Sequence, residues 1–197
     1  MSSAILPSAY LAPLEYYSVL KNNDSVFVEH HENFVKQTYR SRCEIYSPSG
    51  KQVLSIPLVK RNHKQTMKEI KISYDYDWQR LHWRSLESAY RRSPFFEFYE
   101  DDFKPFYHEK KFDYLIDLNE EMQQLLLSLL KLKTTYIFTN EFKLNYEGGD
   151  DFRNEIIIEK DKIKRYNQVF ETRHRFIPNL SIIDLIFNQG PRSLDYI

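Results

Sequence analysis

The sequence predicts an α/β fold, a single domain in which helices pack against a mixed or mainly parallel sheet. Three observations support this prediction. The chain has 197 residues, slightly more than the usual size of one domain. Segments with apolar residues at alternate positions, typical of strands, alternate with segments of helical spacing. No internal repeat or low-complexity tract divides the chain. We therefore expect one domain over residues 1–197, with a polar, flexible loop near residues 145–155.

The first third of the chain predicts a strand, a helix and four further strands. Residues 3–6, "SAIL", resemble a short strand, and Pro13 suits the first turn of a helix. Residues 25–30, "SVFVEH", alternate apolar and polar side chains and include β-branched residues. Residues 43–59 contain two alternating runs around a Pro-Ser-Gly turn, the pattern of a hairpin. Residues 68–74, "KEIKISY", have the alternation of another strand.

Two helices are predicted next. Asp75 or Asp77 can cap a helix that runs from Trp78 to about Arg92, since a carboxylate accepts hydrogen bonds from the first free N–H groups of a helix. A second helical segment begins at Phe95. We expect Pro105 to interrupt it, because proline lacks the N–H that the helix interior requires.

The last third of the chain predicts a long helix, two strands and a short helix. Apolar residues recur every three or four positions from Leu115 to Leu132, which indicates an amphipathic helix. Residues 134–139, "TTYIFT", and residues 156–159, "IIIE", have the composition of strands. Residues 179–191, "NLSIIDLIFNQGP", begin with residues that cap helices and end with Gly-Pro, so a short final helix is expected.

The overall charge of the chain excludes broad electrostatic attraction to polyanions. The 28 basic residues are balanced by 28 acidic residues, so we expect no nucleic acid partner, and a charged ligand must be recognised locally. Glycine occurs four times, and neither GxGxxG nor GxxxxGK is present, which argues against a phosphate loop of either type. The sequence therefore predicts neither a nucleotide cofactor of those classes nor any other cofactor.

Cysteine usage and hydropathy point to a cytoplasmic protein. Cys43 is the sole cysteine, so an intrachain disulfide and a cysteine-rich zinc site are excluded. The N-terminal sequence lacks the basic region and the continuous apolar run of a secretory signal. No apolar run approaches the ~20 residues of a membrane-spanning helix. We expect a cytoplasmic location and no membrane span.

The first candidate for catalysis is the segment "DWQRLHWRSLESAYRRSPFFEFYEDDFKPFY", residues 77–107, in which aromatic and charged residues are dense. On a helix, His82 and Ser85 lie on one stripe because they are three residues apart. His82 could act as a general base and Ser85 could bind a substrate or be activated by that base. The alternative is a histidine at the edge of the core that a hydroxyl group holds in place.

A second candidate, for ligand binding, precedes the predicted hairpin. In an extended segment Arg40 and Arg42 point in the same direction, while Gln37 and Tyr39 point in the other. Arginine binds phosphate and carboxylate groups through two parallel hydrogen bonds, so these residues could bind an anionic substrate together with Lys36. The alternative is a solvated loop whose arginines pair with nearby acids.

Two other groups of polar residues have side chains of types that bind metals or substrates. His30, His31 and Glu32 are of metal-ligating types, but adjacent side chains on a strand diverge, so we expect no metal site. Asp184 and Asn188 are four residues apart and form a polar pair on one face of the final helix. They could contact a substrate, or the helix could simply bury its many apolar residues.

Four longer stretches of the sequence carry a further signal. They are "YLAPLEYYSVL", "ENFVKQTYRSRCEI" followed by "GKQVLSIPL", "DWQRLHWRSLESAYRRSPFFEFY", and "YNQVFETRHRFIPNLSIIDLIFNQGP". Together they resemble the WbqC-like proteins, found among bacterial polysaccharide and O-antigen biosynthesis genes, over nearly the whole chain. The chain departs from the family pattern at "LPSAY", where the family has glutamine-proline before the tyrosine, and at Ser41, where it has asparagine.

The resemblance implies a cytoplasmic α/β protein that takes part in making or decorating surface polysaccharide. A transferase for acyl, aminoacyl or related groups, acting on a nucleotide-linked amino sugar, would use arginines for the diphosphate and His82 as base. The alternatives are a non-catalytic module that binds sugar or nucleotide, and an interaction protein. We expect Tyr10, Arg40, Arg42 and His82 to lie in one cavity with the C-terminal segment. The donor, the acceptor and the oligomeric state stay open.

Overall fold

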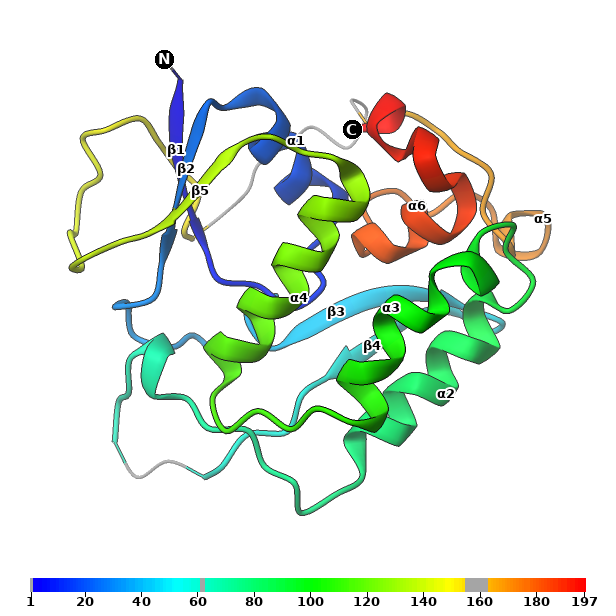
Figure 1. The fold of residues 1–197 in the computed structure, drawn as a ribbon, viewed down its shortest axis with the longest axis horizontal. Coiled ribbons are helices and arrows are strands. Elements are labelled where there is room, and N and C mark those ends of the chain that lie inside the picture. Colours follow the sequence, from blue (N-terminus) through cyan, green and yellow to red (C-terminus); the bar gives the residue numbers. More distant parts are fainter. Residues whose placement is uncertain (1, 61–62, 155–162) are drawn as a thin grey trace.

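A four-stranded parallel sheet forms one part of the fold. The computed structural model describes residues 2–60, 63–154 and 163–197, and Figure 1 shows their arrangement. The strand order is β5-β2-β1-β6, and every pairing in this sheet is parallel. The strands are β1 (Ser3–Pro7), β2 (Ser25–Glu29), β5 (Thr135–Phe138) and β6 (Asp150–Asp151). The predicted α/β class with a mainly parallel sheet is therefore confirmed.

Two helices connect strands of this sheet, as parallel pairing requires. Helix α1 (Leu14–Asn22) links β1 to β2, and helix α4 (Leu115–Leu130) precedes β5. Helix α4 follows the predicted leucine stripe and buries it. It ends at Lys131, which has φ 55° and donates its backbone N–H to carbonyls of the last turn. A left-handed residue at this position is a common helix end.

The second part of the fold is a hairpin on which one helix packs, and a second helix packs on the first. Strands β3 (Arg42–Ser47) and β4 (Gly50–Ser55) pair antiparallel, which confirms the predicted hairpin. Gly50 has φ 103°, a conformation that L side chains rarely adopt. Helix α2 (Trp78–Tyr90) packs on β3 and on helix α3 (Phe96–His108). In Figure 1, α4 lies between the parallel sheet and the α2–α3 pair.

Helix α3 corrects one prediction from the sequence. Pro105 lies inside the helix and does not interrupt it. The lost backbone hydrogen bond affects one turn, while Phe103, Phe106 and Tyr107 around the proline are buried in the core. Burial of three aromatic side chains outweighs a cost of about 3 kcal/mol for an interior proline. The helix therefore continues to His108.

The predicted strand at residues 68–74 is also wrong. The chain instead forms a short 3-10 helix, η1 (Met67–Glu69), followed by isolated bridges at Lys71 and Ile72. Thr66 and Glu69 form a capping box that starts this turn, so local hydrogen bonds replace the pairing of a strand. The predicted strand at residues 156–159 lies outside the described residues.

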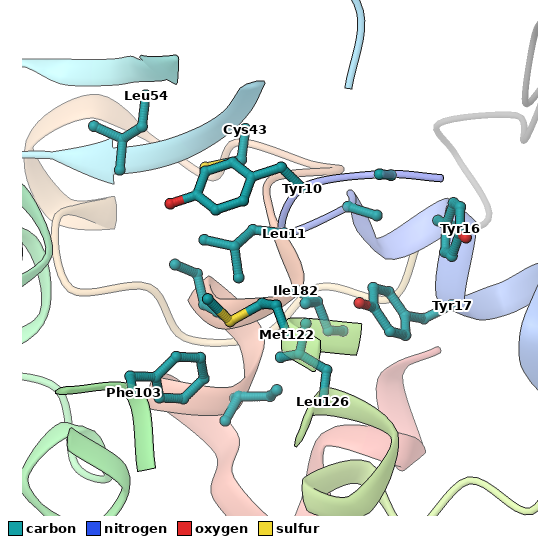
Figure 2. Close-up of a cluster of buried hydrophobic side chains, with 14 of the residues drawn as sticks. Tyr10, Leu11, Tyr16, Tyr17, Cys43, Leu54, Phe103, Met122, Leu126 and Ile182 are labelled. Atoms are coloured by element: carbon teal, nitrogen blue, oxygen red, sulfur yellow. The ribbon is translucent and has the colours of Figure 1, made fainter. Parts of the chain in front are cut away.

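The C-terminal region packs against helices α1 and α3 and strand β3. A one-turn helix, α5 (Glu171–His174), is followed by helix α6 (Ile182–Gln189), which confirms the final helix, and by a 3-10 segment, η3 (Gly190–Tyr196). Figure 2 shows side chains from distant parts of the chain, among them Tyr10, Met122 and Ile182, in one hydrophobic core. Within residues 2–60, 63–154 and 163–197, no helix has both the length and the apolar character needed to cross a membrane.

Candidate functional site

A pocket of about 380 Å³ lies at the carboxyl end of β1. Its lining comes from the turn after β1, the start of α1, the segment that leads into β3 and the residues after β6. Ligands of parallel α/β sheets bind beyond the carboxyl ends of the strands, where the loops meet. Four residues predicted from the sequence line the pocket, namely Gln37, Tyr39, Arg40 and Arg42.

Arg42 is the most informative residue of this lining. Its side chain is half-buried, and its Nε atom is shielded from solvent and has no hydrogen-bond partner among residues 2–60, 63–154 and 163–197. Glu44, two residues further along β3, pairs with Lys51 at 3.0 Å. Within the described part of the chain, Arg42 makes no ion pair. A buried donor without a partner costs about 1–3 kcal/mol, so an external acceptor in the pocket would be bound favourably.

Tyr39 and Gln37 add polar groups to the same pocket. The Tyr39 hydroxyl has no hydrogen bond among residues 2–60, 63–154 and 163–197. Burial raises the pKa of Tyr39 to about 12, and the charges of Glu44 and Glu15 act in the same direction. The phenol therefore stays protonated at neutral pH and can donate a hydrogen bond to a ligand. Gln37 is exposed and has φ 63°.

The start of helix α1 faces the pocket but does not offer its backbone donors. The N–H of Leu14 donates to the carbonyl of Leu180 at 3.1 Å, and the N–H of Glu15 donates to Oδ1 of Asn179 at 3.1 Å. Free N–H groups at a helix start often bind anions, but here the C-terminal segment occupies them. Recognition of an anion in this pocket consequently falls to side chains.

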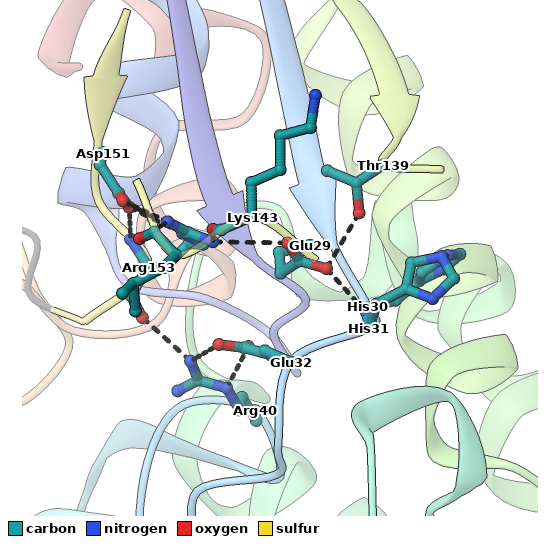
Figure 3. Close-up of polar contacts among 10 residues, drawn as sticks. Glu29, His30, His31, Glu32, Arg40, Thr139, Lys143, Asp151 and Arg153 are labelled. Carbon is teal, nitrogen blue, oxygen red and sulfur yellow. Dashed lines mark hydrogen bonds and ion pairs between the residues drawn. The ribbon is translucent and has the colours of Figure 1, made fainter. Parts of the chain in front are cut away.

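Arg40 has a different environment from Arg42, although both line the pocket. Its guanidinium donates to both carboxylate oxygens of Glu32, at 2.7 and 2.8 Å, and to the carbonyl of Arg153 at 2.9 Å. Figure 3 shows this arrangement. Burial raises the pKa of Glu32, and Arg40 counteracts that effect. Arg40 is thus one of two paired arginines that line the pocket. It pairs with an acid, but in a buried position and not in a solvated loop.

The second paired arginine, Arg153, was not predicted. It donates to the carboxylate of Asp151 at 2.5 to 3.1 Å and reaches Glu29, at the end of β2, at 3.5 Å. The Arg153 guanidinium holds the pKa of Asp151 below its usual range. The local sequence around residue 150 does not distinguish Arg153 from a solvated arginine, because its burial depends on contact with Glu29, from a strand distant in the sequence (Figure 3).

Tyr10 and His82 lie together, but in the core and outside the pocket lining. The Tyr10 hydroxyl is 3.1 Å from Nδ1 of His82 and 2.7 Å from the hydroxyl of Tyr107. Burial lowers the pKa of His82 to about 4, while a hydrogen bond to the backbone of Ser55 opposes that shift. The imidazole is therefore neutral near pH 7. The structure brings His82 together with Tyr10 and not with the arginines of the pocket.

Ser85 has hydrogen-bond partners other than His82. Its hydroxyl donates to the carbonyl of Leu81 at 3.0 Å and accepts a hydrogen bond from Nε2 of Gln52, on β4, at 3.1 Å. No hydrogen bond joins Ser85 to His82 in the part of the chain that the structure describes. The two side chains share a helix but contact different partners.

Asp184 and Asn188 are interior residues of α6. Asp184 is fully buried and accepts hydrogen bonds from the Tyr166 hydroxyl at 2.7 Å and from Gln168 at 3.0 Å. Burial raises the pKa of Asp184 to about 6. Asn188 donates to the backbone carbonyl of Asp184 at 2.7 Å. Neither residue lines the pocket at β1.

The side chains of His30 and His31 lie closer together than the sequence predicted. We expected adjacent side chains to diverge as on a strand, yet their Nε2 atoms lie 2.9 Å apart. The reason is that β2 ends at Glu29, so the two histidines lie in the turn beyond the strand (Figure 3). In the described ranges, no cluster of three or more His, Cys, Asp or Glu side chains has an arrangement that could hold a metal ion.

Fold and pocket together define an α/β protein with a polar pocket at the carboxyl end of a parallel sheet. The chain belongs to the WbqC-like protein family, whose model matches residues 8–157 and 150–196. It is 25% identical to a protein of Mycobacterium tuberculosis, "Uncharacterized protein Rv1507c", over 98% of this chain and 96% of that protein. No solved structure matches the chain.

Proposed function

We propose that the pocket at β1 binds a nucleotide-linked sugar through its anionic diphosphate, and that the protein serves bacterial surface-polysaccharide biosynthesis. The observation that carries the proposal is Arg42. Its Nε has no hydrogen-bond partner in the described part of the chain, while the other arginines of the pocket lining, Arg40 and Arg153, are paired. A guanidinium donates to phosphate oxygens through parallel hydrogen bonds, the strongest type available to this lining.

The size and polarity of the pocket agree with such a ligand. A volume of about 380 Å³ lies within the usual range of small-molecule sites, roughly 300–1,000 Å³. Tyr39 can donate a hydrogen bond, Gln37 can both donate and accept, and Phe152 and Tyr16 add ring surface. Sugars are commonly bound by such combinations of rings and hydrogen-bonding groups. The likeness to WbqC-like proteins associated with polysaccharide genes supplies the biological setting.

A transfer reaction on the bound sugar is the finer part of the proposal. The sequence predicted His82 and Ser85 as the catalytic residues of this transfer, but both lie outside the pocket lining. Asp184 and Asn188, predicted to bind the substrate, are buried and do not line the pocket either. The geometry thus supports binding of a ligand more directly than His82-dependent transfer. A non-catalytic binding module is the second candidate, and it is favoured by the burial of His82 among tyrosine side chains.

Calorimetric titration with a panel of nucleotide sugars tests the binding proposal. Arg42→Gln should weaken binding by about 10-fold or more, since a hydrogen bond to a charged group contributes about 1.5–3 kcal/mol. Arg80→Gln is the matched control, because Arg80 is an exposed arginine on α2 with its own partner, Asp77, at 3.0 Å. If the wild type binds no member of the panel, or Arg42→Gln binds as well as the control, the proposal fails.

Product detection by mass spectrometry separates the two candidates. Wild type is incubated with the bound nucleotide sugar and acyl or aminoacyl donors, and His82→Gln is compared with it. A transferase that uses His82 as base should lose about 10²–10⁴-fold in turnover while ligand affinity is retained. A binding module shows the Arg42 effect and yields no product with any donor.

A further inference from the structure

Strand β5 lies at an edge of the parallel sheet. Among the strands of the described residues it pairs with β2 alone, because the order is β5-β2-β1-β6. Its sequence, Thr135–Phe138, contains no charged residue and no proline, which are common means of protecting an edge strand. The opposite edge is β6, which consists of two exposed aspartates. Strand β5 is therefore the edge to which a further strand can add.

The backbone of β5 offers two residues for such pairing. Thr135 and Thr139 donate their N–H groups to backbone carbonyls next to and within β2, at 3.2 and 3.0 Å. Successive residues of a strand direct their backbone groups to opposite edges, so those of Tyr136 and Phe138 point away from β2. No other backbone segment bonds to these groups in the part of the chain that the structure describes.

A second copy of the chain fits this edge when its β5 runs antiparallel to the first. A two-fold axis through Ile137 pairs Tyr136 with the partner's Phe138, and Phe138 with the partner's Tyr136. Each of these pairs then exchanges both of its N–H···O=C hydrogen bonds. The side chain of Ile137 is 44% exposed in the single chain. In the pairing, the two Ile137 side chains lie directly opposite each other and contribute an apolar contact.

Helix α4 carries an acidic pocket beside one end of β5. This acidic pocket is lined by Phe138 and, on α4, by Asp117, Glu120 and Glu121. Lys68 is the one lysine in its lining of described residues. The Oε2 atom of Glu120 is shielded from solvent and has no hydrogen-bond partner in the described ranges. A shielded carboxylate oxygen of this kind is stabilised by a donor from outside the chain.

A basic pocket lies beside the other end of β5. Lys131, Lys133 and Tyr136 line this basic pocket, and no acidic side chain of the described residues does. Both lysines are exposed, and neither makes an ion pair within the part of the chain described. Gln124 lines both pockets, so the two are neighbours along α4.

The charges of the two pockets favour the antiparallel orientation. The acidic pocket lies at the Phe138 end of β5 and the basic pocket at the Tyr136 end. When Tyr136 pairs with the partner's Phe138, the basic pocket of each chain faces the acidic pocket of the other. Complementary charge across an interface fixes its register and suppresses other arrangements.

We propose that the protein forms a two-fold symmetric homodimer by antiparallel pairing of β5 with β5 of a second copy, the acidic pocket of each chain facing the basic pocket of the other. The dimer joins the two parallel sheets into one continuous sheet and covers the edge that β5 presents. Strand β2 separates β5 from β1, so the interface is distinct from the pocket at β1.

Sedimentation velocity of the full chain over a range of concentrations tests the dimer. The wild type should sediment as a dimer, and Ile137→Asp should weaken its association by about 10-fold or more, because two carboxylates then lie opposite each other. Val53→Asp is the matched control. Val53 is 47% exposed on β4, an edge of the other sheet, and its substitution should leave the dimer intact. Circular dichroism confirms that both variants are folded.

An exchange of charges tests the orientation of the two chains. Lys133→Glu and Asp117→Lys should each weaken the homodimer by about 5-fold or more, because like charges then face each other at both contacts between pockets. An equimolar mixture of the two variants should associate about as tightly as the wild type. In that heterodimer every contact between pockets again joins opposite charges.

Three results would overturn the inference. The first is a wild type that stays monomeric at the highest concentration measured, which would leave the β5 edge to an extended peptide of another protein. The second is a dimer that Ile137→Asp does not weaken, or that Val53→Asp weakens equally. The third is a mixture of Lys133→Glu and Asp117→Lys that associates no better than either variant alone. Ligand binding at β1 is measured separately by titration, so its outcome is independent of these results.

Discussion

The hydroxyl of Tyr10 lies 3.1 Å from Nδ1 of His82, and the two residues are 72 positions apart in the sequence. Since the ring also bonds to the backbone of Ser55, one imidazole nitrogen donates and the other accepts. Tyr10 in turn contacts the hydroxyl of Tyr107. A buried chain of hydrogen bonds therefore connects the turn after β1 to helices α2 and α3.

Tyr10→Phe should destabilise the protein by about 1–3 kcal/mol, because it leaves buried groups of His82 and Tyr107 without a partner. Tyr39→Phe is the matched control. The Tyr39 hydroxyl lacks a hydrogen bond in the described residues, so its loss should change the unfolding free energy by about 0.5 kcal/mol or less. Urea unfolding measures both values. Equal destabilisation by the two substitutions would show that the Tyr10 contact contributes nothing specific.

Protonation of His82 should oppose folding. Burial lowers its pKa in the folded state to about 4, below the ordinary value near 6.5. The unfolded chain then binds the proton more readily, so the contribution of neutral His82 to stability is complete above pH 6.5 and is lost as the pH falls toward 4. NMR titration of the imidazole carbon resonances should show no transition for His82 between pH 5 and 8. A midpoint near 6.5 would contradict the buried environment.

The pH dependence of stability that Asp184 causes should have the opposite sign to that of His82. Its folded-state pKa is raised to about 6, so folding favours the protonated carboxyl, and this contribution is complete below the ordinary value near 3.8. It is lost as the pH rises through 6. Asp184→Asn keeps a neutral side chain of similar shape at every pH. The stability of the wild type relative to this variant should therefore fall between pH 4 and pH 7 in urea unfolding, and a constant difference would refute the shift.

Arg40 and Arg42 should differ sharply in their effect on stability, although both line the pocket. Arg40→Met leaves the Glu32 carboxylate buried without its cation, which costs about 3–5 kcal/mol. Arg42→Met removes a guanidinium whose Nε has no partner among the described residues, so stability should stay the same or increase slightly. Guanidinium chloride would obscure ion pairs, and urea is therefore the denaturant of choice. Similar losses in both variants would mean that Arg42 also has a structural role.

The sequence predicts local patterns well because those patterns depend on neighbouring residues. The leucine spacing of α4, the Pro-Ser-Gly turn of the hairpin and the alternation of β2 all lead to the elements observed. The prediction at Pro105 fails because the tertiary packing of α3 outweighs the local preference of proline. The strand predicted at residues 68–74 fails because the capping box of Thr66 and Glu69 stabilises a helical turn there.

The grouping of polar residues depends on contacts that spacing cannot reveal. Gln37, Tyr39 and Arg42 line one pocket, although the alternation of an extended segment predicted that Gln37 and Tyr39 would point away from Arg42. The segment is a turn rather than an extended strand, and Gln37 has φ 63°, so the alternation does not hold there. His82 could not be separated from them by sequence, because its burial results from α2 packing on β3 and from Tyr10. Arg153 escaped prediction since its partners, Asp151 and Glu29, belong to a two-residue strand and to the end of β2.

A crystal structure of the protein with uridine diphosphate N-acetylglucosamine, or with whichever nucleotide sugar the titrations select, tests the central claim most directly. We predict that the diphosphate lies in the pocket at β1, with a phosphate oxygen within hydrogen-bonding distance of Nε of Arg42 and the Tyr39 hydroxyl beside the ligand. A ligand bound elsewhere, with Arg42 still without a partner, would contradict the assignment of this pocket as the functional site.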